Sequence, residues 1–295
     1  MYYNANTILY NNGQFLKASE AKTDLYGQTL HYGYGVFEGI RSYKTSKGTK
    51  IFKAKEHYER LKRSAELVHI PFEYSLQELE NISYHVLEKN NMSDAYLRPL
   101  VYCDPNMSLN KPTKVNLMIC AWEWGSYLGE KLLKLCISSY QRPNPKSVKV
   151  EAKVCGHYMN SILATVEAKD KGFDEGLLLD AHGNIAEGSG ANFFCEKNGQ
   201  LFTPSLGNIL PGITRATVIE LCRELNIPCT ELHLFPEQLK NVDSAFFCGT
   251  AAEIIGIESI DNIPFAKKWN ESMGAKIQQA YSDLVREKKL ITQLA

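Results

Sequence analysis

Apolar residues in the first half of the chain repeat at two different spacings, which predict helices and strands respectively. The helical spacing of three and four residues occurs in Lys55–Val68 and Leu76–Lys89. Ser75 precedes the second stretch and Glu78 follows three residues later, which is the capping-box pattern of a helix start. The apolar stripe of the first helix consists of Tyr58, Leu61, Ala65 and Val68.

Runs of β-branched and aromatic residues bounded by turn residues predict the strands of this half. The Asn-Asn-Gly turn at 11–13 predicts a hairpin, because Asn-Gly accepts the backbone conformation of a tight turn. The expected strands are Thr7–Tyr10, Gln14–Lys17, Val36–Tyr43, Thr49–Lys53, Tyr96–Cys103 and Val115–Trp124.

The second half also mixes strand-like and helix-like segments. We predict helices over His157–Lys169, Ile213–Leu225 and Glu271–Lys288, the second directly after Pro211-Gly212. The expected strands are Leu133–Tyr140, Gly176–Asp180, Ile185–Glu196, Leu201–Thr203, Thr230–Leu234, Ser244–Cys248 and Ile254–Ile257. The pattern is therefore that of an α+β protein.

A short glycine-bearing segment, Gly125–Lys131, separates the two halves. A chain of 295 residues is long enough for two ordinary domains. We therefore predict a smaller N-terminal α/β domain over residues 1–125, a linker over 126–131 and a larger C-terminal domain over 132–295.

Composition and charge exclude several classes of function. Lys plus Arg and Asp plus Glu are equal, at 33 each, so no bulk field favours nucleic acid or an anionic membrane. The eight cysteines are scattered without a C-x-x-C pair, which argues against a zinc site or a disulfide framework. No signal-peptide pattern and no apolar run of about 18 residues is evident. We expect a cytoplasmic protein with no metal site.

Four glycine-bearing segments are candidates for ligand binding: His31–Arg41, Glu187–Phe194, Leu210–Arg215 and Cys248–Glu253. Glycine lets the backbone approach a ligand closely, although each segment alone could be an ordinary turn. Leu210–Arg215 opens a predicted helix, whose free N–H groups and dipole would favour an anion. Together these segments favour a ligand that carries phosphate. The motifs of nucleotide triphosphate and dinucleotide sites are missing.

Lys153 and Glu187 are the candidate chemical groups, and the residues alone leave each of them open. Lys153 lies among apolar and small residues before a predicted helix. It is either a solvated loop charge or an amine desolvated enough for Schiff-base chemistry. Glu187 lies among glycines beside a strand and is either a turn residue or a buried partner for a cation.

Taken together, the motifs resemble the class IV aminotransferases, pyridoxal 5′-phosphate (PLP) enzymes of fold type IV, and most closely the bacterial branched-chain amino acid aminotransferases. The resemblance spans nearly the whole chain in order. It rests on His31–Arg41, Glu56–Leu61, Ala95–Pro99, Trp124–Gly129, Ala152–Tyr158, Glu187–Gly190, Leu210–Arg215 and Gly249–Glu253. It implies two domains, the second with a mainly β core surrounded by helices, and at least a homodimer.

The resemblance also implies roles for individual residues around PLP. Lys153 matches the Schiff-base lysine, which would move a proton as a general acid and base. Glu187 would pair with the pyridine nitrogen and Tyr158 would hydrogen-bond the ring hydroxyl. The residues implied to hold the phosphate are Arg60, Ile213 through its backbone, Thr214 and Thr250.

Substrate residues follow from the same resemblance. The family's apolar pocket for an aliphatic side chain matches Tyr32, Phe37, Trp124 and Tyr127, and its carboxylate recognition matches Tyr96, Arg98, Thr250 and Ala251. The sequence departs from the pattern at His157, which is usually Asn, at Tyr34-Gly35, and in the short loop Cys103–Thr113.

The implied reaction is transfer of the amino group of L-leucine, L-isoleucine or L-valine to 2-oxoglutarate. Three alternatives stand beside it: a D-amino acid aminotransferase, an aminodeoxychorismate lyase and a non-catalytic PLP-binding relative. Leu100 stands where the D-specific enzymes carry the His of an Arg-x-His pair, which disfavours the first. The aromatic residues leave little room for the cyclic substrate of the second. Intact Lys153 and Glu187 argue against the third.

Overall fold

The computed structural model describes residues 2–125, 128 and 131–288 and has two compact units. Unit 1 consists of Met1–Gly125 and Ala152–His157, and unit 2 of Ser126–Glu151 and Tyr158–Ala295. Ala152–His157, which the sequence pattern predicts in the second domain, pack with unit 1. The reason is a return of the chain: Val154 forms a β-bridge with Val36, and Ala152 and Val154 are buried in the core of unit 1.

Within the described residues, unit 1 contains a seven-stranded sheet whose pairings are all antiparallel. Its order is β2-β1-β7-β6-β4-β5, with β3 also paired to β6. Asn12 and Gly13 both have positive φ in the turn between β1 and β2, which confirms the predicted hairpin. The strands are β1 (Ile8–Asn11), β2 (Gln14–Lys17), β3 (Gly35–Phe37), β4 (Ile40–Thr45), β5 (Gly48–Ile51), β6 (Ala95–Cys103) and β7 (Val115–Trp122).

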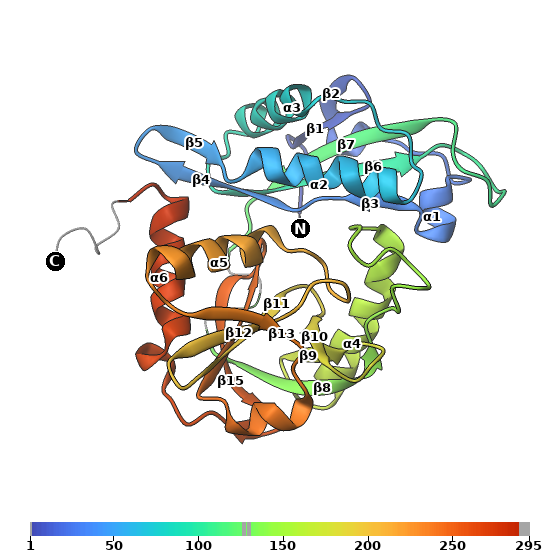
Figure 1. Cartoon of the computed structure of the whole chain (residues 1–295). Coiled ribbons are helices and arrows are strands. Elements are labelled where there is room, and N and C mark those ends of the chain that lie inside the picture. The colour runs from blue at the N-terminus through green and yellow to red at the C-terminus, as the bar shows by residue number, and fades with distance from the viewer. Residues whose placement is uncertain (1, 126–127, 129–130, 289–295) are drawn as a thin grey trace. The chain divides into compact units, whose positions relative to one another are not determined.

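Two amphipathic helices, α2 (Ala54–Leu67) and α3 (Leu76–Lys89), pack against each other and on this sheet (Figure 1). Both agree with the predicted ranges to within a residue. A short helix, α1 (Gln28–Tyr32), precedes β3. The core between helices and sheet contains Leu61 and Leu79 from the helices and Ile40, Leu97 and Leu117 from the strands, each fully buried.

The sheet of unit 2 closes into a ring. Its order is β10-β9-β8-β15-β14-β11-β12-β13, and β10 also pairs with β11, so the six strands from β10 to β11 form a closed circuit. β16 extends the sheet from β15. The strands are β8 (Leu133–Gln141), β9 (Glu175–Leu179), β10 (Ile185–Gly188), β11 (Asn192–Lys197), β12 (Gln200–Pro204), β13 (Cys229–Leu232), β14 (Ser244–Gly249), β15 (Glu253–Ile260) and β16 (Ile263–Pro264).

The α-helices that the structure describes around this ring are α4 (Tyr158–Asp170), α5 (Ile213–Glu224) and α6 (Met273–Val285). In the view of Figure 1, α5 and α6 lie on one side of the strands and α4 on the other. α4 contacts β8 and β9, whereas α5 and α6 contact β14 and each other. The mixed α+β fold, with a mainly β core and surrounding helices in its second unit, is as predicted.

Two segments that the sequence analysis treats as single strands are interrupted in the structure. Val36–Tyr43 breaks at Glu38 and Gly39, between β3 and β4. A Cβ atom on Gly39 would lie 1.8 Å from the Tyr96 hydroxyl oxygen, so this position requires glycine. Ile185–Glu196 breaks between β10 and β11, where Glu187 and Asn192 face each other across the turn. Glu38 lies in the first interruption and Glu187 lies one residue before the end of β10, and each carboxylate belongs to a polar cluster.

The capping box predicted from Ser75 is present at the start of α3. The Ser75 hydroxyl accepts a hydrogen bond from the Glu78 N–H, and the Glu78 carboxylate accepts one from the Ser75 N–H. We expect Ser75→Ala to lower the free energy of unfolding by about 1 kcal/mol, because one N–H of the first turn loses its acceptor. Urea unfolding followed by circular dichroism measures this. Ser46→Ala, in an exposed turn, is the control. Equal losses in the two variants would contradict the capping contribution.

Candidate active site

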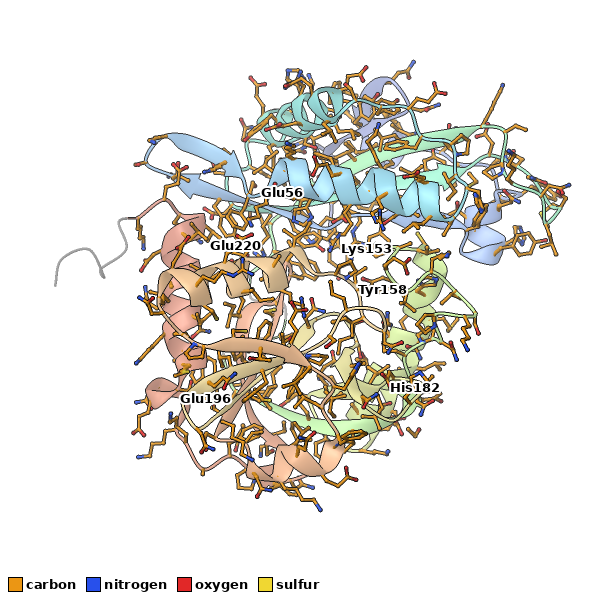
Figure 2. The ribbon with its side chains drawn as sticks, in the orientation of Figure 1. Glu56, Lys153, Tyr158, His182, Glu196 and Glu220 are labelled. Atoms are coloured by element: carbon orange, nitrogen blue, oxygen red, sulfur yellow. The ribbon has the colours of Figure 1, made fainter. Side chains whose placement is uncertain are left out.

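The residues that the sequence analysis assigns to the site fall into two groups, one in each unit. Lys153 of unit 1 and Tyr158 of unit 2 are labelled in Figure 2. Tyr127 lies outside the described residues. Unit 1 holds Tyr32, Phe37, Arg60, Tyr96, Arg98, Trp124 and Lys153; unit 2 holds Tyr158, Glu187, Ile213, Thr214, Thr250 and Ala251.

The backbone of Lys153 is fixed by neighbours on both sides. Its N–H donates to the Ser64 hydroxyl on α2 at 3.0 Å, and its carbonyl accepts from the Phe37 N–H at 3.1 Å. The adjacent residues Ala152 and Val154 are buried. The main chain at Lys153 therefore has little freedom, and only the flexible side chain of this lysine can change position.

Phe37 is contacted by two cations. Lys153 Nζ lies 4.9 Å from the centroid of its ring and Arg98 Cζ lies 4.6 Å from it. Arg98 also lies over the rings of Tyr96 and Trp122, at 5.5 and 5.7 Å. The structure thus brings together three of the predicted residues, Lys153, Phe37 and Arg98. Buried Arg98 Nε has no hydrogen-bond partner among the described residues.

The other aromatic residues predicted for the substrate pocket are placed differently. The Trp124 ring packs edge-on against Tyr96 at 4.7 Å, which extends the aromatic group around Arg98. Tyr32 ends α1 and is 46% exposed, and its hydroxyl donates to the Met107 carbonyl in the loop between β6 and β7. Tyr96 and Trp124 therefore belong to one aromatic group, whereas Tyr32 is hydrogen-bonded to the loop between β6 and β7.

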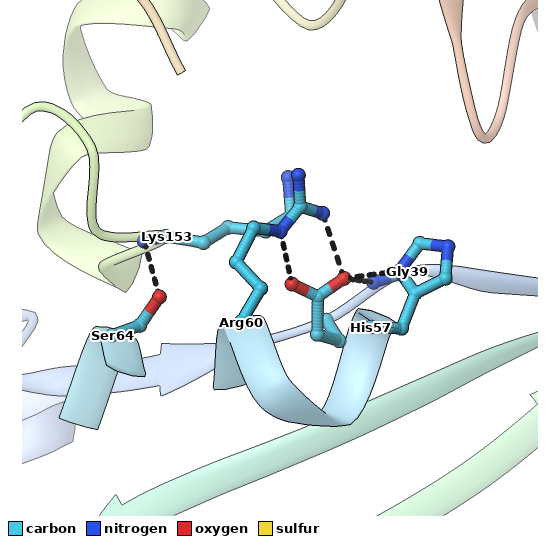
Figure 3. A network of polar contacts seen from close by, with 6 residues as sticks. Gly39, His57, Arg60, Ser64 and Lys153 are labelled. Carbon is cyan, nitrogen blue, oxygen red and sulfur yellow. Dashed lines mark hydrogen bonds and ion pairs between the residues drawn. The ribbon is translucent and has the colours of Figure 1, made fainter. Parts of the chain in front are cut away.

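Arg60, on α2, is held by a buried carboxylate (Figure 3). Glu38 Oε1 accepts from Arg60 Nε at 2.6 Å and Glu38 Oε2 accepts from Arg60 Nη2 at 2.8 Å. Glu38 Oε2 also accepts from His57 Nδ1 at 2.7 Å and from the Gly39 N–H at 3.2 Å. Glu38 is fully buried, and only 10% of the Arg60 side chain is exposed. The result is a desolvated, bidentate ion pair.

The charges in this cluster set the ionisation of Glu38 and His57. Burial would raise the pKa of Glu38, but Arg60 and His57 outweigh it and hold that pKa well below its usual range. Burial lowers the pKa of His57 despite the opposing effect of Glu38. Because an ionised carboxylate only accepts, His57 carries its proton on Nδ1.

Sequence reasoning missed Glu38 and undervalued His57. Glu38 stands in an apolar run that predicts a strand, and His57 lies on a helix with other polar residues. A charged residue in an otherwise apolar strand is the one local signal that could have singled out Glu38. His57 and Arg60 lie three positions apart on α2, so both reach Glu38 from the same helix face.

In unit 2, Glu187 is the centre of a second buried cluster. Its Oε1 accepts from the Leu210 N–H at 3.1 Å, and its Oε2 accepts from Asn192 Nδ2 at 3.0 Å. Asn192 Nδ2 also donates to the Leu210 carbonyl at 3.0 Å. Arg142 Nε lies 2.9 Å from Glu187 Oε1, an ion pair whose two side chains are 8% and 7% exposed. The Glu187 carboxylate is therefore shielded from water, and the positive charge of Arg142 compensates its negative charge.

The same cluster positions the amino end of α5. Leu210 is bonded through its N–H and its carbonyl, so the segment leading to the Gly212 N-cap is fixed. A Cβ atom on Gly212 would lie 1.9 Å from Asn192 Oδ1, so a side chain here would displace the Asn192 amide from its bonds to Glu187 and Leu210. No side chain caps α5, no acidic residue lies in its first turn, and Thr214 is buried there. This helix end suits an anion.

The remaining residues of unit 2 lie near chain turns. Thr250 and Ala251 occupy the turn between β14 and β15. A Cβ atom on Gly249 would lie 3.3 Å from the Gly190 carbonyl oxygen, so this turn approaches the turn between β10 and β11. Tyr158 is the first residue of α4 and is half-buried.

The part of the chain that the structure describes lacks both a metal-binding cluster and a membrane-spanning helix. It contains no group of three or more His, Cys, Asp or Glu side chains arranged to hold a metal ion. Among the same residues, no helix is both long and apolar enough to cross a membrane.

Comparison with known proteins places the chain in a family. The pattern described as "Amino-transferase class IV" matches residues 35–260. The branched-chain-amino-acid aminotransferase of Escherichia coli K12 is 39% identical over 284 residues, covering 94% of this chain and 92% of the relative. Two solved structures of branched-chain aminotransferases are similar. That of Thermoproteus uzoniensis with norvaline has a TM-score of 0.92 at 36% identity, covering 96% of each chain. The PLP form from Thermobaculum terrenum has a TM-score of 0.89 at 30% identity, covering 97% of this chain and 96% of the other. The chain therefore belongs to the class IV aminotransferase family.

Proposed function

We propose that the protein transfers the amino group of branched-chain L-amino acids to 2-oxoglutarate with PLP as cofactor. The observation that carries the proposal is the amine of Lys153 on a backbone fixed by Ser64 and Phe37, at the position that the resemblance assigns to the Schiff-base lysine. The full-length identity to branched-chain aminotransferases supports the reaction and its substrates.

Each unit, taken by itself, has residues that fit a part of PLP. Lys153 offers an amine, and Glu187 offers a buried carboxylate for a protonated ring nitrogen. The uncapped amino end of α5 and buried Thr214 offer donors for a phosphate. Gly212 leaves Asn192 in place to bond Glu187, because a Cβ atom there would lie 1.9 Å from Asn192 Oδ1. We assign phosphate contacts also to Arg60 and Thr250, and a contact with the ring hydroxyl to Tyr158.

When bound, PLP supplies an electron sink for the charge that develops at the substrate Cα. Lys153 removes the proton from that Cα as a general base, and its fixed backbone limits the positions that Nζ must search. Glu187 supplies the negative charge beside the ring nitrogen, and Arg142 at 2.9 Å stabilises its carboxylate form. The Leu210 N–H and Asn192 keep the carboxylate from rotating.

Substrate recognition is assigned to the group around Phe37. Phe37, Tyr96 and Trp124 supply apolar surface for an aliphatic side chain, and Arg98 supplies a cation for a carboxylate. The unpartnered Nε of Arg98 supports this assignment, because a buried donor without an acceptor is costly unless a ligand completes it. Tyr32, Tyr127 and the backbone of Thr250 and Ala251 complete the proposed set.

Single-turnover spectroscopy tests the function. L-leucine, L-glutamate and D-alanine are added separately to the PLP-loaded protein, and the visible absorbance of the cofactor is followed. We expect L-leucine and L-glutamate to bleach it and D-alanine to leave it unchanged. Bleaching by D-alanine alone would show a D-amino acid aminotransferase. A band that no amino acid changes would favour a lyase or a non-catalytic protein, and failure to bind PLP would overturn the whole proposal.

We propose also that the protein is at least a homodimer and that it works in the cytoplasm. α4 exposes Met159, Ile162 and Val166 on one face, an apolar stripe suited to a second copy of the chain. All eight cysteines are free thiols, as in reducing compartments. Light scattering of the protein as it elutes from a size-exclusion column measures the mass of the assembly, and the mass of a monomer would exclude the dimer.

A further inference from the structure

We propose that Glu38 is a positioning residue for phosphate: it fixes the guanidinium of Arg60 in the orientation that binds the phosphate of PLP. The inference rests on the proposed function, in which Arg60 contacts that phosphate, and it adds a residue that sequence reasoning did not find. Glu38 itself touches no ligand in this proposal and acts through Arg60.

The geometry of the ion pair determines what Arg60 can do. Glu38 engages the Nε and Nη2 donors, which lie on one edge of the planar guanidinium. With this edge held, the plane of the group is set and Nη1 points away from Glu38. A free arginine side chain would populate many rotamers, and fixing it beforehand removes that entropy cost from ligand binding.

Glu38 is in turn held by the fold on every side. The Gly39 N–H and His57 Nδ1 both donate to Oε2, and the Glu38 N–H donates to the Pro99 carbonyl at 2.9 Å. The carboxylate has no solvent exposure, so water does not compete for its lone pairs. The break between β3 and β4 is the local structure that turns Glu38 toward α2 instead of into the sheet.

The charges favour an anion beside Arg60. Lys153 Nζ lies 4.9 Å from the ring centroid of Phe37, the residue before Glu38, and the positive charges of Arg60 and Lys153 both lower the pKa of His57. Glu38 compensates one of these two positive charges, and neutral His57 adds none. The cluster therefore has a net charge of about +1, which attracts a phosphate. Because Glu38 compensates one cation, the cluster does not bury two uncompensated cations in the absence of a phosphate.

The test compares two aldehydes that differ only in phosphate. The dissociation constants of PLP and pyridoxal are measured by absorbance titration of cofactor-free protein, for wild type and Glu38→Gln. Glutamine has no negative charge, and its amide nitrogen cannot accept from Arg60 or His57. We expect the dissociation constant of PLP to rise about tenfold or more, the loss of roughly one charge-assisted contact. We expect the dissociation constant of pyridoxal to change by less than about twofold in the same variant.

A double-mutant cycle with Arg60→Met shows whether Glu38 acts through Arg60. In that background, Glu38→Gln should weaken PLP binding no further. If Glu38→Gln does not fold, Glu38→Asp replaces it, because a shorter carboxylate cannot engage both nitrogens from the same backbone. Equal losses for PLP and pyridoxal, or full additivity with Arg60→Met, would overturn the inference. If wild type itself does not prefer PLP over pyridoxal, the phosphate assignment of the proposed function fails instead.

Discussion

Replacing Lys153 by alanine is expected to lower kcat for L-leucine transamination by about 10⁴-fold, the upper range for loss of a general acid–base group. The fold should survive, because Ser64 and Phe37 bond the backbone of residue 153 and Val154 makes its bridge without the lysine side chain. Glutamate formation from 2-oxoglutarate measures the rate, and circular dichroism verifies the fold.

The matched control for this variant is Lys149→Ala, which removes an exposed lysine a few positions earlier. A small primary amine added to Lys153→Ala should restore part of the rate, since the missing function is an amine that accepts a proton. Activity above a tenth of wild type in Lys153→Ala, without added amine, would exclude Lys153 as the base.

Glu187→Gln should have the second largest effect, on stability as well as on rate. The substitution leaves the buried charge of Arg142 without its anion, which costs about 3–5 kcal/mol of unfolding free energy. The rate should fall by about 10²- to 10³-fold, because an electrostatic partner of the reaction is lost. Urea unfolding and glutamate formation measure the two effects.

A second substitution separates the two effects of Glu187→Gln. Adding Arg142→Met removes the uncompensated charge, so the double variant should recover most of the lost stability while its rate stays low. A double variant no more stable than Glu187→Gln would show that the ion pair is not the source of the loss. Recovery of the rate together with stability would exclude a chemical role for Glu187.

The helices and hairpins could be predicted because their signals are local. α3 begins at Leu76 as expected, since Ser75 and Glu78 cap it through contacts within one turn. The Asn198-Gly199 turn between β11 and β12 also has positive φ at both residues, the conformation that this dipeptide favours. Such features need no information from distant parts of the chain.

The polar clusters could not be predicted in this way, because their contacts are distant in sequence. Glu38 is paired with Arg60 and His57 across a strand–helix contact, and Glu187 with Arg142 and Leu210 across separate strands and loops. Glu38 stands in an apolar run that predicts only a strand, and Glu187 stands beside a glycine-rich turn, so neither local pattern indicates a polar cluster. The roles given to Lys153 and Glu187 came from the resemblance, since composition and spacing alone left both residues open.

The return of Ala152–His157 to unit 1 has a consequence for how the chain folds as it is made. A ribosome releases residues 1–125 well before 152–157, so the growing N-terminal segment first meets water with the places of Ala152 and Val154 unfilled. Its packing can be completed only after part of unit 2 has also emerged. The last piece added to unit 1 is then the one that carries Lys153, so the amine takes its place in the same step that completes the core of unit 1.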